Sequence, residues 1–214
     1  MMMTHNSRSE EVMNSITHAL GLGLGIAACV YLIVRASMDG NAWHIVSVSL
    51  YGSTLIALYL ASTLYHSLTF TRAHAWLRVL DHASIYLFIA GSYIPFALVP
   101  LRGGWGWSIF GVITGLALLG ILALCFVRRK IFPLTSVLSL LMGWTIVIAA
   151  VPLVQRISMD ALLLLLAGGI TYSLGVIFFA SKRPFAHTAW HLMVLFGSGF
   201  HFIAILSLLP TLPH

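Results

Sequence analysis

The chain has 214 residues, of which 60% are hydrophobic and only 7% are charged. A soluble domain carries about a quarter charged residues, so this composition excludes a soluble protein and leaves no polar stretch for a separate soluble domain. The net charge of +6 does not indicate a nucleic-acid partner, because the basic residues lie in short loops between apolar runs, where they set membrane orientation.

Seven apolar runs have about the 20 residues that a helix needs to cross the hydrocarbon core. The loops between them are short, so each helix must run antiparallel to the one before it. The sequence therefore predicts an all-α membrane protein, a single seven-transmembrane-helix bundle over residues 18–209, with short tails at 1–17 and 210–214. The expected spans cover approximately 18–36, 43–66, 79–99, 105–127, 133–153, 161–180 and 187–209.

Basic residues are distributed unequally between the two sides of this bundle. The N-terminal side carries eight of them, Arg8, Arg72, Arg78, Arg128, Arg129, Lys130, Lys182 and Arg183. The opposite side carries three, Arg35, Arg102 and Arg156. By the positive-inside rule, the N-terminus is expected in the cytoplasm and the C-terminus outside.

The antiparallel order of the spans places several polar residues together on the inner side. His66 ends the second span, Asp81 and His82 begin the third, and His187 and His191 begin the seventh. His187 and His191 are spaced i and i+4, so they share one helix face at metal-ligand spacing. Three neutral imidazoles with an open position are a common catalytic zinc arrangement. The alternative is an interfacial histidine pair that is merely hydrogen-bonded to its neighbours.

Two further side chains are candidates for chemistry at such a metal. Position 188 is Thr, so the HExxH pattern with its neighbouring Glu base is absent, and Asp81 becomes the candidate acid–base group. Asp81 either acts on the metal's water or pairs with Arg78 at the interface. Ser62 lies one turn from His66 and either holds that water or packs as a small residue.

Other polar or small residues are expected to be structural. His201 is about 15 Å along the helix from His191, too far to share its metal, and is expected to pack or hydrogen-bond. His82 directly follows Asp81 and is expected to point elsewhere. Cys29 and Cys125 are interpreted as core residues rather than a disulfide. Close helix packing is expected at Gly21, Gly23, Gly25, Gly197 and Gly199, and helix kinks at Pro95 and Pro152.

Five segments, in order along almost the whole chain, resemble the hemolysin III proteins. These form the bacterial branch of the progestin and adipoQ receptor superfamily and are distantly similar to adiponectin receptors and alkaline ceramidases. The segments are Glu11-Val-Met-Asn14-Ser-Ile-Thr17-His18-Ala-Leu-Gly21, Ser62-Thr-Leu-Tyr65-His66, Arg78-Val-Leu-Asp81-His82, Gly91-Ser-Tyr93-Ile-Pro95 and His187-Thr-Ala-Trp190-His191.

This resemblance implies a site as well as a fold. It implies zinc bound by His66, His187 and His191, with Asp81 and Ser62 as catalytic residues around the metal water. The matching segments also supply candidates for supporting roles around the ligands, namely Tyr65, His82, His18, Asn14 and Glu11. The implied fold is a seven-helix bundle with a cytoplasmic N-terminus, in the bacterial inner membrane.

Three functions are ranked on these grounds. The first is a zinc-dependent hydrolase acting on a lipid amide or ester, as the ceramidase-like relatives imply. The second is a metal-stabilised sensor or regulator of membrane fluidity or energetics that uses membrane lipid as a ligand. The third is a cytolysin, which is disfavoured because a pore-forming toxin must first be soluble. Loops of a few residues on the outer side leave no surface for a large protein ligand.

Overall fold

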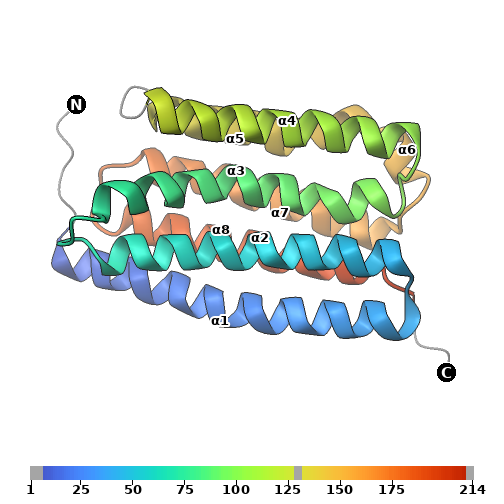
Figure 1. The fold of residues 1–214 in the computed structure, drawn as a ribbon, viewed down its shortest axis with the longest axis horizontal. Coiled ribbons are helices and arrows are strands. Elements are labelled where there is room, and N and C mark those ends of the chain that lie inside the picture. The colour runs from blue at the N-terminus through green and yellow to red at the C-terminus, as the bar shows by residue number, and fades with distance from the viewer. Residues whose placement is uncertain (1–6, 128–131, 211–214) are drawn as a thin grey trace.

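The computed structural model describes residues 7–127 and 132–210, and all regular secondary structure within them is helical. The expected tail 210–214 lies almost wholly outside these residues. Seven helical segments here are long and apolar enough to cross a membrane, which confirms the predicted bundle. Figure 1 shows them lengthwise: α1 (Arg8–Asp39), α2 (Ala42–Ser67), α3 (His74–Leu98), α4 (Gly104–Val127), α5 (Phe132–Trp144) continued by α6 (Ala150–Val154), α7 (Met159–Ala180) and α8 (Ala186–Leu206).

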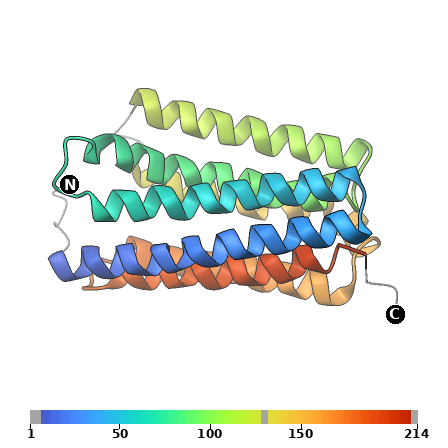
Figure 2. The same ribbon diagram turned by 60° about the horizontal axis from the view of Figure 1, so that its bottom comes forward.

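The first helix begins at Arg8, ten residues before the expected start near residue 18. Ser7 caps it: the Ser7 hydroxyl accepts the Glu10 backbone N–H at 3.2 Å, and the Glu10 carboxylate accepts the Ser7 N–H at 2.7 Å. Such a reciprocal capping box satisfies two otherwise unpaired backbone donors. Residues 8–17, expected as a tail, therefore extend α1 toward the ends of α2 and α8, beside which it lies (Figure 2).

The fifth span is broken in the middle, whereas the sequence predicted one helix over 133–153 with a kink at Pro152. A 3₁₀ turn, η2 (Thr145–Ala149), separates α5 from α6. The Tyr93 hydroxyl of α3 lies 2.7 Å from the carbonyl oxygens of Met142 and Gly143, to which it donates, and accepts the Ile146 N–H at 2.9 Å. A break in hydrocarbon persists only when its freed backbone groups find such partners.

Some of the glycines let helices approach closely. A Cβ on Gly21 would lie 2.7 Å from the Tyr59 ring of α2, and one on Gly25 would lie 3.5 Å from it. A Cβ on Gly197 would lie 2.6 Å from the ring of Tyr172. The packing prediction is confirmed at Gly21 and Gly197, whereas a Cβ on Gly25 would make only ordinary van der Waals contact.

Two other sequence expectations about packing are corrected by the structure. Gly23 and Gly199 have open space at the Cβ position, so close packing there was wrong. Cys29 is buried, but Cys125 is exposed on α4 instead of lying in the core; both thiols are free, as expected. Pro95 lies inside α3, which continues to Leu98, and the kink expected there stays a prediction.

Gly21 and Gly23 form a matched pair for testing the α1–α2 contact. Gly21→Ala is expected to destabilise the protein by about 1–3 kcal/mol, because the added methyl overpacks against Tyr59. Gly23→Ala is expected to be neutral or to stabilise by up to about 1 kcal/mol through helix propensity. Unfolding of both variants in detergent measures the difference, and equal stabilities would contradict the described α1–α2 packing.

Candidate metal centre

Three histidines meet at the end of the bundle where α1 begins. His66 comes from the last turn of α2, and His187 and His191 come from the first turns of α8; one ring nitrogen of each lies within 4.8 Å of the others. His66 is 3% exposed and His191 is 1% exposed. The sequence expectation that these three imidazoles converge agrees with this geometry. We call them the histidine cluster.

The cluster fits a divalent metal. Zinc–nitrogen bonds of about 2.0–2.1 Å place tetrahedral ligand atoms about 3.4 Å apart, so small side-chain rotations close the present spacing. Nε2 of His66 is buried and has no hydrogen-bond partner among the described residues. An unpaired polar atom buried in an apolar environment is costly, and a shared ion would pair it. Neutral imidazole suits zinc, and also copper, nickel and iron.

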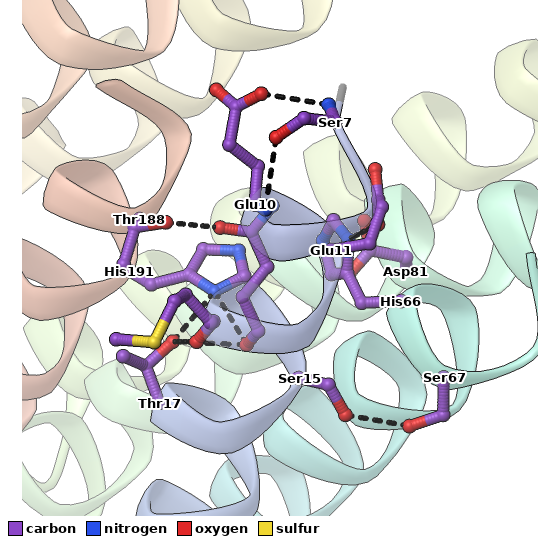
Figure 3. Close-up of polar contacts among 12 residues, drawn as sticks. Ser7, Glu10, Glu11, Ser15, Thr17, His66, Ser67, Asp81, Thr188 and His191 are labelled. Atoms are coloured by element: carbon purple, nitrogen blue, oxygen red, sulfur yellow. Dashed lines mark hydrogen bonds and ion pairs between the residues drawn. The ribbon is translucent and has the colours of Figure 1, made fainter. Parts of the chain in front are cut away.

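The Nδ1 atoms of two cluster members, His66 and His191, are hydrogen-bonded to α1 (Figure 3). Nδ1 of His66 lies 2.6 Å from the Glu11 carboxylate. Nδ1 of His191 lies 3.1 Å from the backbone oxygen of Asn14 and 3.2 Å from the Thr17 hydroxyl. The Thr17 proton is directed to backbone carbonyls of its own helix, so His191 donates through Nδ1. Its Nε2 therefore carries the lone pair that a metal needs.

The expected acid–base residue lies close to the cluster. Asp81 of α3 is 9% exposed, Ser62 of α2 is 1% exposed, and both line the cavity that His187 and His191 also line. Asp81 is not one of the three side chains whose ligand atoms meet. A carboxylate and a hydroxyl are thus available next to the metal ligands rather than as ligands.

His82 differs from the sequence expectation. It was expected to point away from the site, yet it lines the same cavity and its Nδ1 lies 3.6 Å from the Asp81 carboxylate. The same nitrogen is 3.0 Å from the Arg78 backbone oxygen. The reason is that both side chains lie in the buried part of α3, where adjacent positions each reach the cavity wall. His82 therefore belongs to the surroundings of Asp81.

The remaining candidates pack around the cluster. The His18 ring stacks on His191 with centroids 3.5 Å apart, and the Tyr65 ring lies edge-on to His66 at 4.8 Å. The Asn14 amide oxygen accepts the Thr188 hydroxyl at 2.6 Å. His201 lies outside the cluster, with Nε2 at 3.3 Å from the Leu165 backbone oxygen, which confirms its interpretation as a hydrogen-bonding residue.

Thr17 and Thr188 were not singled out from the sequence as site residues. A signal was present in the spacing, since Glu11, Asn14 and His18 recur at i, i+3 and i+7 and so share one face of a helix. Thr17 extends that polar face. Because the segment was expected to be a tail, its helical periodicity was not used.

A mostly apolar cavity leads away from the cluster. It begins at His187 and Asp81 and reaches Tyr93, Trp144 and His201 farther along the bundle. A second cavity shares Tyr93, Trp144 and His201 with it. A site that combines a few convergent polar groups with apolar walls is typical of small-ligand binding.

Comparisons with known proteins show similarity along almost the whole chain. A family model described as "Haemolysin-III related" matches residues 6–202. The chain is 43% identical to Hemolysin-3 of Bacillus cereus over 204 residues, which cover 94% of this chain and 93% of that protein. It is 42% identical to the Hemolysin-3 homolog of Bacillus subtilis (strain 168), covering 95% and 96%. The human Monocyte to macrophage differentiation factor is 30% identical, covering 95% and 86%.

His187 and His201 lie on the same helix and give a matched test of the centre. Purified wild-type protein is expected to carry one divalent metal ion, His187→Ala to lose it, and His201→Ala to keep it, because only His187 belongs to the cluster. Elemental analysis of gently purified protein measures the content. Wild-type protein without metal, or equal metal in both variants, would contradict the assignment.

Metal removal is expected to loosen the bundle, because an ion bound to His66 and His191 links α2 to α8. Strong chelation, or acidification that protonates imidazole and expels the metal, should lower the thermal melting temperature of the wild type. His187→Ala protein should not respond to the chelator. An unchanged wild-type melting temperature after verified metal loss would rule out a clamping role.

Proposed function

The chain belongs to the haemolysin-III family of multi-pass membrane proteins, and we propose that it is a zinc-dependent hydrolase of a lipid amide or ester bond. One observation carries this proposal: the histidine cluster, Asp81 and Ser62 stand together at one end of a largely apolar cavity. A purely structural metal site needs neither a neighbouring carboxylate nor an adjoining cavity. A hydrolase acting on membrane lipid needs both.

His66, His187 and His191 would hold the ion, leaving one coordination position open. Zinc held by these residues would supply Lewis-acid polarisation of the carbonyl group and would make the attacking water more acidic. Asp81 takes the proton from the attacking water as the water oxygen bonds to the carbonyl carbon. Asp81 then returns that proton to the departing amine or alcohol as the carbonyl carbon's bond to it breaks.

The surrounding residues position the reactants. Ser62 lies one turn from His66 on α2, where its hydroxyl can orient the water or the Asp81 carboxylate. The apolar walls between the cluster and Tyr93 receive the lipid tail. With the N-terminus in the cytoplasm, as the basic residues predict, the cluster lies near the cytoplasmic leaflet. This depth suits a lipid whose amide or ester group sits at the interface while its tail stays in hydrocarbon.

A second candidate is a metal-stabilised sensor or regulator of the membrane's state, without catalysis. It is favoured by the position of the cluster, which joins α2 and α8 and contacts α1. Such a protein would respond to lipid or metal by changing helix packing. Two bacterial relatives are named Hemolysin-3 or its homolog, but a chain that is 60% hydrophobic is poorly suited to act as a soluble cytolysin.

Asp81→Asn separates catalysis from metal binding. The variant is expected to retain zinc, since Asp81 is outside the cluster, and to lose about 10²–10⁴-fold in turnover, the usual contribution of general acid–base assistance. His191→Ala should lose both metal and turnover. Metal content and hydrolysis of lipid amides and esters, including ceramide, are measured on the same preparations in bilayers.

Full turnover by the Asp81→Asn variant would refute the role of this carboxylate. Zinc-loaded wild-type protein that hydrolyses no lipid amide or ester would refute the hydrolase and favour the sensor.

A further inference from the structure

The first turns of α1 contact both helices that supply the cluster. The Glu11 carboxylate reaches His66 of α2, and the Asn14 backbone oxygen reaches His191 of α8. Glu10 accepts the backbone N–H of Phe185 at 2.8 Å, where the chain takes a left-handed turn (φ 58°) into α8. This segment therefore contacts the cluster through the Nδ1 atoms of His66 and His191.

The contact between Glu11 and His66 has a defined direction. With Glu11 ionised, its carboxylate only accepts hydrogen bonds, and Nδ1 of His66 is then the donor across the 2.6 Å contact. In neutral imidazole a proton on Nδ1 leaves the lone pair on Nε2. Nε2 is the buried atom that has no partner among the residues described. Nδ1 of His66 thus donates to Glu11, and Nε2 of the same ring carries the lone pair.

We propose that Glu11 is a positioning residue that fixes the tautomer and orientation of His66 so that Nε2 faces the metal. This inference rests on the proposed metal centre and adds a residue to it from α1. Histidine ligands commonly donate their second N–H to a carboxylate or backbone carbonyl, and loss of such a partner typically costs about 10–100-fold in metal affinity. Asn14 serves His191 in the same way through its backbone, which a side-chain substitution cannot remove.

A nearby hydrogen bond supplies the matched control. Ser15 and Ser67 also join α1 to α2, with their hydroxyl oxygens 2.6 Å apart, and Figure 3 has no dashed line from either side chain to a cluster histidine. If Glu11 merely held the two helices together, Ser15→Ala would have a similar effect. If Glu11 acts through the His66 ring, only substitutions of Glu11 change metal affinity.

The experiment measures zinc affinity by chelator competition on the full chain in bilayers. Glu11→Ala is expected to bind zinc about 10–100-fold more weakly than wild type. Glu11→Gln, which keeps the size of the side chain and a neutral acceptor, should fall between them because charge-assisted hydrogen bonds are stronger. Ser15→Ala should match wild type. Equal affinities for wild type, Glu11→Gln and Glu11→Ala would overturn the proposal.

The tautomer of His66 can also be measured directly, without bound metal and without an activity assay. In metal-free protein, ¹⁵N chemical shifts of His66 should show a proton on Nδ1 and a bare Nε2, and this preference should be lost in Glu11→Ala. A wild-type His66 protonated on Nε2 would overturn the role of Glu11. Wild-type protein that shows the expected tautomer but takes up no zinc would instead overturn the proposed function, so the two failures are distinguishable.

Discussion

Hydrocarbon supplies no hydrogen-bond partners, so a membrane bundle must satisfy each buried polar atom from within the protein. This constraint explains the polar contacts at two places in the bundle. At the broken fifth span, the Tyr93 hydroxyl meets two carbonyl oxygens and one N–H of the interrupted backbone. At the histidine cluster, α1 satisfies one nitrogen of His66 and one of His191. The second nitrogen of each ring then defines where a metal would bind.

The cluster depends on helices that are distant in sequence but adjacent in space. α1 lies against both α2 and α8, and its polar face reaches a histidine on each. The Asp81 carboxylate of α3 lines the same cavity as His187 and His191. A site of this kind is assembled only when the whole bundle has formed, because no single helix supplies both the ligands and the groups that orient them.

Hydropathy and connectivity were sufficient to predict the seven spans and the convergence of His66, His187 and His191. The apolar runs have the length of a membrane crossing, and short loops force the antiparallel order. The helical start at Arg8 was missed because hydropathy counts Glu11 and Asn14 as polar without knowing their partners. The break at Thr145–Ala149 was missed because Pro152 was the visible helix breaker, whereas the stabilising hydroxyl belongs to Tyr93 of another helix.

X-ray absorption at the zinc edge of the purified, zinc-bearing protein tests the metal centre most directly. The arrangement of His66, His187 and His191 predicts three imidazole nitrogens at about 2.0–2.1 Å and one oxygen neighbour at the open position. The His66→Ala variant should carry no zinc, because the cluster then lacks one of its three ligands. A spectrum with sulfur neighbours, or with oxygen neighbours alone, would contradict a metal centre built from these three histidines.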